Sequence, residues 1–468
     1  MSIKRLILLA FSLSLLVSCA NKSMTRYEEI AQPLEKKGID ATIKKMKDEQ
    51  DDLYGSNTEF LYYFDLGCLY HYKRDFKESA ANFAKAEQIY EDLYTKSVTN
   101  EAAAIVTNDN TRPYRARPFE LLLMYEYQIL NYLAMMDVDG ALVEVKRSQI
   151  AMNALYQKDQ EKVNDNGLLR YLSAIVYELD GSTDDAAISY INAVKAYKEG
   201  KLQLPEEVLE FVAEGLRKAD REGDLMTLGT QVPGITPKAT SIREAGQEIV
   251  VIGYGGHSPI LGELYMSGTF VSGGVMNLYY KDGETGERKS FTLVAPPVSG
   301  AGNGESFHIG FSLPEIRKLQ NRVDHFEVSL DNAPRLRPEK VMAVDEELQQ
   351  NMDDEKTTTI TRTAIRVILR TIAAQKAKQA MKTDNILLNL ITSLGTDVAQ
   401  TQIEQADLRL GLFMPHSLYM TRIPVTTGQH KVVVTANGSN GETVEIFEFD
   451  KINVTKGQKV FLIVPSLR

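Results

Sequence analysis

The stretch LGCLYHYKRDFKESAANFAKA, residues 66–86, sets out large and small side chains at the spacing of two packed antiparallel helices. Small residues let two helices approach closely, and aromatic residues fill the space between their turns. The spacing therefore predicts a helical hairpin, and the members of this frame include the expected core residues Leu66, Gly67, Tyr70, Ser79, Phe83 and Ala86.

The same frame recurs twice, and its offsets match tetratricopeptide spacing. Its key tyrosines, Tyr70, Tyr132 and Tyr177, lie 62 and 45 positions apart, whereas a regular array repeats at about 34. Residues 24–228 are therefore expected to form an irregular tetratricopeptide-like α-solenoid, with a helical bundle of coincidental spacing as the alternative. The further frame residues are Ala141, Val145, Ser148, Ala174, Ala186, Tyr190 and Ala193.

The chain changes character after residue 228, so the fold class is predicted as α+β. Gly, Pro and Thr dominate a linker at 229–246, and short apolar runs with turn signals follow at 247–345, which predicts a β-rich domain. A helical insertion is expected at 346–407 and closing strands at 408–468, which pair with the earlier ones. The expected strands are 248–252, 276–281, 289–294, 308–311, 326–330, 417–423, 430–436, 443–449 and 459–465, with a hairpin turn at Asp282-Gly283.

The helical insertion contains a basic amphipathic segment at 357–383. Arg362, Arg366 and Arg370 recur every four residues, so they share one side, while Ile360, Ala364, Ile368 and Ile372 line another. The three arginines are candidates for surface contact with anionic lipid or an acidic partner. The favoured interpretation is that the apolar stripe covers a β-sheet and leaves the arginines in solvent.

The N-terminus predicts where the protein resides. A basic start at Lys4-Arg5, an apolar run too short to span a bilayer, and the small-residue site Leu16-Val17-Ser18-Cys19 form a secretory signal. The pattern resembles a bacterial lipoprotein signal, which implies that residues 1–18 are removed, that Cys19 carries lipid and that 19–23 form a tether. Ala20, where aspartate would favour inner-membrane retention, indicates anchoring in the outer membrane facing the periplasm.

The net charge and the cysteine content limit the partners and the chemistry that the chain can have. The net charge of −10 argues against nucleic acid as a partner. Cys68, the other cysteine, lies in an apolar aromatic stretch and is expected to be a buried, inert thiol.

No motif in the chain predicts catalysis, a cofactor or a metal. The run Gly253-Tyr254-Gly255-Gly256-His257 follows a strand but lacks the residues that complete a phosphate loop, so it is expected to be a turn or β-bulge. The acidic pairs Asp51-Asp52, Asp184-Asp185 and Asp353-Asp354 are interpreted as helix caps and solvated charge. The histidines at 257, 308, 325, 416 and 430 show no metal-ligand spacing.

Three stretches resemble a family of bacterial tetratricopeptide-containing lipoproteins without an assigned function. The resemblance is carried by Arg117-Pro118-Phe119-Glu120 with Tyr132-Leu133-Ala134 and Ala141-Leu142-Val143-Glu144, by Thr361-Arg362-Thr363-Ala364-Ile365-Arg366, and by Glu404-Gln405-Ala406-Asp407-Leu408-Arg409 with Pro415, Arg422-Ile423-Pro424-Val425 and Gly428-Gln429-His430. Family members carry tryptophan after the Asp-x-Arg, where this chain has Leu410-Gly411-Leu412. The resemblance implies a periplasm-facing protein, often encoded beside lipoproteins that resemble activators of penicillin-binding proteins.

The leading hypothesis is a non-enzymatic, membrane-anchored scaffold or adaptor in cell-envelope assembly, with peptidoglycan assembly as the associated process. Its expected partner is an envelope protein or peptide, held by the helical repeats and a second docking surface on the β domain. Two alternatives remain: a pilotin-like chaperone for an outer-membrane secretion or surface-polymer complex, and an envelope hydrolase whose site has no recognisable spacing.

Overall fold

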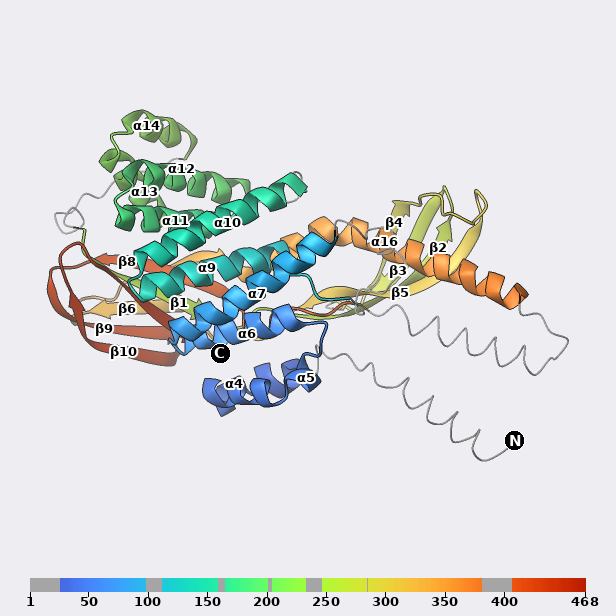
Figure 1. Ribbon diagram of the computed structural model, residues 1–468, viewed down its shortest axis with the longest axis horizontal. Coiled ribbons are helices and arrows are strands. Elements are labelled where there is room, and N and C mark those ends of the chain that lie inside the picture. Colours follow the sequence, from blue (N-terminus) through green and yellow to red (C-terminus); the bar gives the residue numbers. More distant parts are fainter. Residues whose placement is uncertain are drawn as a thin grey trace.

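A computed structural model describes residues 26–97, 112–158, 165–200, 204–232, 246–283, 285–380 and 406–468. Helices dominate the N-terminal region and strands the C-terminal region, so the α+β prediction is confirmed (Figure 1). The N-terminal elements are η1 (Tyr27–Ala31), α3 (Leu34–Lys37), α4 (Ile39–Asp48), α5 (Gln50–Leu53), α6 (Glu59–Tyr72), α7 (Phe76–Ser97), α9 (Pro118–Ala134), α10 (Val138–Lys158), α11 (Gly167–Asp180), α12 (Thr183–Glu199), α13 (Glu206–Lys218) and α14 (Glu222–Gln231). Helix α14 thus extends three residues into the predicted linker, and most of that linker lies outside the described residues.

Four helical hairpins follow one another: α6 with α7, α9 with α10, α11 with α12, and α13 with α14. Each hairpin turn holds one residue at positive φ, which lets the chain reverse within a few residues. These residues are Arg74, Met136, Gly181 and Asp220. In each turn, the backbone amide of the residue that follows donates a hydrogen bond of 2.8–3.0 Å to the carbonyl oxygen five residues before it. The accepting carbonyls belong to Tyr70, Tyr132, Tyr177 and Leu216. The three tyrosines aligned from the sequence are therefore equivalent in the structure, and a fourth hairpin continues the series.

Within the first hairpin, Phe83 lies directly on Gly67. A Cβ atom at Gly67 would lie 2.6 Å from the Phe83 ring, and the Ser79 hydroxyl donates to the Gly67 carbonyl at 2.8 Å. The predicted core residues are buried in this hairpin and in the later ones. Those at most 2% exposed are Leu66, Phe83, Ala86, Ala141 and Tyr190. Tyr70 and Tyr177 are 7% and 9% exposed, and Tyr132 is partly buried.

The C-terminal region contains three sheets. The central sheet has the order β11-β1-β8-β7, with β1 (Glu248–Gly255) parallel to β11 (Lys459–Ser466) and antiparallel to β8 (Ser417–Pro424), which pairs with β7 (Glu339–Ala343). A second sheet has the order β10-β9-β6, from Thr443–Val454, Gly428–Asn437 and His325–Leu330. The predicted pairing of the closing strands with earlier ones is confirmed.

The central sheet is the middle of three layers. Val250 and Ile252 of β1 face the helices, whereas Ile249 and Val251 face the second sheet. Burial on both faces explains why β1 reads as a continuous apolar run.

The glycine-rich run after this strand is not the turn that the sequence predicted. Gly253 and Gly255 belong to β1, and Phe326 lies so close to Gly253 that a Cβ atom would approach its ring to 2.8 Å. Only Gly256 has the positive φ, +65°, of a turn. Close packing between the sheets, rather than chain reversal, accounts for the first two glycines.

The third sheet forms a separate lobe with a long helix, so the β-rich region is not one compact domain (Figure 1). Its order is β4-β3-β2-β5, from Arg288–Val294, Val275–Lys281, Ile260–Val271 and Ser306–Arg317. Strands β2 and β7 were not predicted. The Asp282-Gly283 turn does connect the antiparallel strands β3 and β4.

Helix α16 (Val344–Ala380) starts two residues before the predicted helical insertion and runs for about 55 Å from the three-layer body onto the lobe. Ile360, Ala364, Ile368 and Ile372 are buried against the third sheet, which confirms that the apolar stripe covers a sheet. The predicted helix beyond Ala380 falls mainly outside the described residues, but Ala406 and Asp407 are not helical.

The arginines of α16 do not all lie in solvent. Arg362 is exposed and Arg370 is half-buried, but Arg366 is only 2% exposed. Thr363, three residues before Arg366, is also buried. Because residues three apart share one side of a helix, α16 is covered on a second side as well as along its apolar stripe. The prediction of Arg366 as a surface contact is therefore wrong.

Candidate functional site

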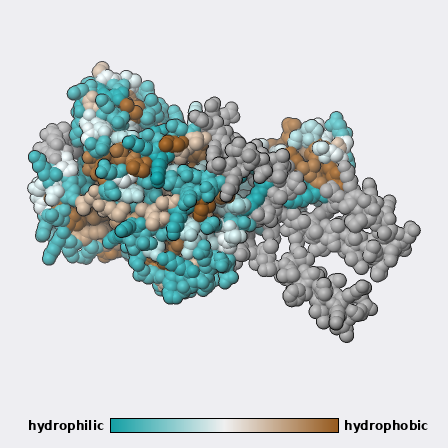
Figure 2. Space-filling view, viewed as in Figure 1, coloured by the Kyte–Doolittle hydropathy of each residue, from teal (hydrophilic) through white to brown (hydrophobic). Residues whose placement is uncertain are grey.

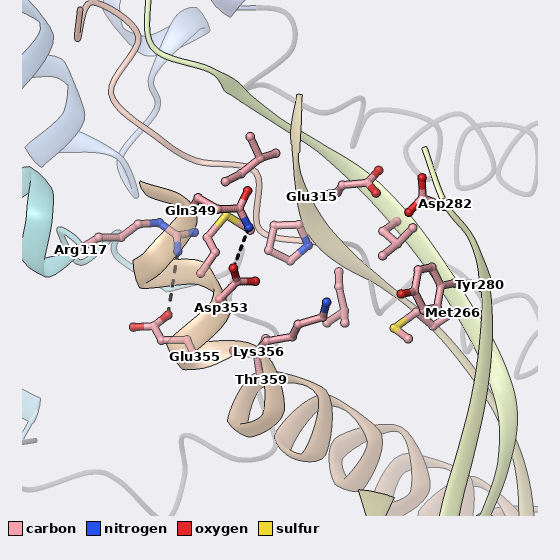
Figure 3. A pocket seen from close by; sticks show the side chains of 15 residues that line it. Arg117, Met266, Tyr280, Asp282, Glu315, Gln349, Asp353, Glu355, Lys356 and Thr359 are labelled. Carbon is pink, nitrogen blue, oxygen red and sulfur yellow. Dashed lines mark hydrogen bonds and ion pairs between the residues drawn. The ribbon is translucent and has the colours of Figure 1, made fainter. Parts of the chain in front are cut away.

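A cleft opens where the lobe meets the three-layer body (Figure 3). It encloses about 260 Å³ between strands β2, β3 and β5 on one side and the first turns of α16 on the other. Strand β2 belongs to the body core at Leu261 and to the lobe core at Met266, and α16 changes cores between Leu348 and Ile360. The cleft therefore exists because two hydrophobic cores separate while the elements that join them continue.

The floor of the cleft is apolar. Leu264, Met266 and Leu313 come from the lobe, and Ile316 and Met352 pack at the edge of the body core. Figure 2 shows hydrophobic residues on the visible face of the lobe, and further hydrophobic patches over the three-layer body. The floor gives the cleft a binding surface that is favourable for apolar groups.

Charged side chains line the walls. The carboxylates are Asp282, Glu315, Asp353 and Glu355, and the cations are Arg117 and Lys356. Lys289 donates a hydrogen bond to Asp282, and so do the amide and hydroxyl of Thr285. These bonds hold the pKa of Asp282 below its usual value. Asp353 accepts a hydrogen bond from the neutral Gln349 amide at 3.0 Å. Among the described residues, Glu315 has no hydrogen bond or ion pair, so the cleft carries carboxylate charge that is not compensated by a cation.

Arg117 reaches the cleft from the start of α9. Its side chain is 16% exposed, and its ion pair with Glu355 is long, at 3.9 Å. Its Nε atom is buried and has no hydrogen-bond acceptor. Glu120 holds the beginning of α9 in place, because its carboxylate accepts from the Arg117 amide at 2.9 Å. The start of α9 thus holds the Arg117 guanidinium at one end of the cleft.

The sequence did not predict this site. Its residues come from α9, three strands of the lobe and α16, which are distant in the chain. Of the lining residues, the sequence singles out Arg117 in a family-like motif, Asp282 in a hairpin turn and Asp353 as solvated charge. No local pattern connects Glu315 with any of them, and a prediction would have required the packing of α16 against β5 and α9.

A second charged cluster is buried and fully paired. Arg422 of β8 donates to Glu248 at 2.7 Å and to Glu178 at 2.8 Å, and its guanidinium lies 3.6 Å from the Phe211 ring centre. Lys459 lies 2.8 Å from Glu248. Arg422 and Lys459, together with Lys218, lower the pKa of Glu178 to about 2 despite its burial. This cluster fastens the helices to the central sheet, and its mutual pairing leaves no group for chemistry.

His71 was not singled out in the sequence, yet it lies at the centre of a buried polar network. Its Nδ1 is 2.7 Å from the Asn131 side-chain oxygen, and its Nε2 is 2.8 Å from the Tyr254 hydroxyl. Burial lowers the pKa of His71 to about 4, so the ring is neutral at pH 7. The Tyr254 of the glycine-rich run thus joins the helices to β1 rather than lining a phosphate site.

The remaining predicted residues have these positions. Cys19 lies outside the described residues. Cys68 is completely buried and burial raises the pKa of its thiol, which agrees with an inert cysteine. In the described ranges no group of three or more His, Cys, Asp or Glu side chains is placed to hold a metal ion. None of the helices within those ranges has the length and apolar character needed to span a bilayer.

Comparisons with known proteins give little further information. No family model matches the sequence, and no curated protein matches it. Among solved structures, the apo form of RapI aligns with a TM-score of 0.33 at 10% identity, over 45% of this chain and 68% of that one. A similarity at this level supports no functional argument.

Proposed function

We propose that this protein is a non-enzymatic, lipid-anchored binding protein that acts as a scaffold or adaptor in cell-envelope assembly. The cleft between α16 and the third sheet is the observation that carries the proposal. It combines an apolar floor, charged walls and a rigid frame, which are the properties of a site that holds part of another molecule. The buried charged clusters elsewhere are internally paired and support the fold.

The helical region supports the same function. We infer that its consecutive hairpins form an irregular tetratricopeptide-like solenoid, because the turns repeat one hydrogen-bond pattern and small residues lie under aromatic rings. Stacked hairpins of this kind present extended surfaces to partners. A lipid on Cys19 would confine both surfaces near the outer membrane and raise their effective concentration for partners there.

The proposal is tested by photocrosslinking in intact cells. A photoreactive amino acid replaces Met352 in the cleft, and a matched control replaces Ile446, which is 57% exposed on β10. We expect a discrete crosslinked product from position 352 that position 446 does not give. Identical products from both positions, or none from position 352, would contradict binding in the cleft.

The anchor is tested separately. Cys19→Ala should move the protein from the membrane fraction to the soluble fraction and remove the lipid mass from its N-terminal peptide. Equal fractionation of the variant and the parent would contradict the proposed anchor without bearing on the cleft.

A further inference from the structure

We propose that the cleft receives a peptide segment in which a basic side chain stands beside an apolar one. This inference rests on the proposed function and specifies the chemistry of its partner. The volume of about 260 Å³ lies below the usual range of pockets that enclose whole small molecules. It suits one or two side chains of a chain that continues past the site.

The cleft divides into an apolar floor and charged walls. Leu264, Met266 and Leu313 offer apolar surface from the strands, and Met352 offers it from α16. An apolar side chain that enters between them leaves water for surface on both sides of the cleft, which provides affinity without selecting charge. Charge selection comes from the walls.

Charge complementarity favours a basic ligand. The lining has four carboxylates and two cations, and Lys289, which pairs with Asp282 from outside the lining, brings the net charge to −1. Asp282 and Glu355 already face cations, namely Lys289 and Arg117. Glu315 on β5 and Asp353 on α16 have no cationic partner among the described residues, and they lie on opposite walls (Figure 3). A lysine or arginine side chain that enters the cleft would be attracted by both carboxylates and could form a charge-assisted hydrogen bond with either.

Arg117 lies at the other end of the cleft, and its ion pair with Glu355 is long, at 3.9 Å. A backbone carbonyl of a peptide is a neutral acceptor for this guanidinium and does not oppose the carboxylates nearby. A peptide with a basic and an apolar side chain therefore matches the acidic walls, the apolar floor and the guanidinium of the cleft together.

The test is calorimetric titration of the purified mature chain with three capped hexapeptides. The peptides are identical except for one central pair: Leu-Arg, Leu-Gln or Leu-Glu. We expect the Leu-Arg peptide to bind most tightly, with affinity that falls as salt increases. Glu315→Gln and Asp353→Asn should each weaken its binding about three- to tenfold and leave the Leu-Gln peptide unaffected. Glu263→Gln, on the opposite face of β2, is the matched control and should change nothing.

Thermal unfolding of each variant shows whether it remains folded. Equal affinity for the three peptides, preference for Leu-Glu, or absence of binding by all three would overturn this inference. The proposed function has a different readout, because crosslinking at position 352 in cells does not depend on the charge of the partner. A crosslink in cells without preference for the basic peptide would therefore refute the inference and retain the function.

Discussion

Glu144 is a buried carboxyl whose two oxygens are not equally satisfied. One oxygen accepts from Arg147 at 3.3 Å, while the other has no hydrogen-bond partner, and the side chain is 3% exposed. Burial raises the pKa of Glu144 to about 7. Because the folded pKa lies above the unfolded one, the protonated form is favoured by folding. The stability that protonated Glu144 contributes to the fold is complete below about pH 4.5 and is lost as the pH rises through 7.

Glu144→Gln should therefore raise the free energy of unfolding at pH 8 by up to about 3 kcal/mol and leave it unchanged at pH 4. Urea denaturation at both values provides the measurement. The exposed Glu448→Gln is the control and should show no such difference. Equal stability of the variant and the parent at pH 8 would show that Glu144 is not protonated in the folded protein near neutrality.

Arg422 is the opposite case, since every part of its guanidinium has a partner. Replacing it with Met leaves Glu248 and Glu178 buried beside Lys459 alone. Removal of one partner from a buried cluster leaves charge uncompensated, so Arg422→Met should lower the free energy of unfolding by about 3–5 kcal/mol. Arg335→Met removes an exposed pair with Glu327 and should cost less than about 1 kcal/mol in the same urea titration. Comparable losses in the two variants would refute this role of the cluster.

At the level of elements, helix packing in the first hairpin depends on the absence of a side chain at Gly67. Gly67→Ala should destabilise the protein by about 1–3 kcal/mol, because the new methyl group meets the Phe83 ring. In a Phe83→Leu background the same substitution should cost less, and a double-mutant cycle measures this coupling. Gly229→Ala is the matched control: nothing lies near its Cβ position in α14, so it should stabilise by roughly 0.5–1 kcal/mol. An additive cycle would contradict the contact.

Some of the helices and strands could be predicted from the sequence, and others could not. Apolar runs identified the buried strands such as β1, and the spacing of small and large residues identified the helical hairpins. Strand β2 was missed because its glycines resemble turn signals, yet Gly268 permits close approach of the β3 backbone and Gly262 lies under Arg317. The cleft could not be predicted because its walls meet only where α16 packs against β5, and packing between distant segments leaves no local pattern.

On the scale of the whole molecule, residues 406–414 connect the helical layer to the central sheet. Leu412 donates its amide to Asp65 at 2.8 Å, and Gly411 donates to Glu120 at 3.0 Å. Arg409 donates to two loop carbonyls, at 3.2 Å for Asn57 and 2.7 Å for Arg112. Helices from the N-terminal half are thus joined to the segment that leads into β8, which favours cooperative unfolding of both regions.

Arg409→Met should therefore lower the unfolding temperature of helices and strands together. The substitution leaves two carbonyls without their donor and Asp407 without its cationic partner, a loss of about 2–4 kcal/mol. Differential scanning calorimetry should show one transition at reduced temperature, and hydrogen exchange should rise in both α6 and β8. The exposed Arg335→Met serves as the control and should leave the transition in place. Two separate transitions, or faster exchange confined to the helices, would show that the layers unfold independently and that this segment does not couple them.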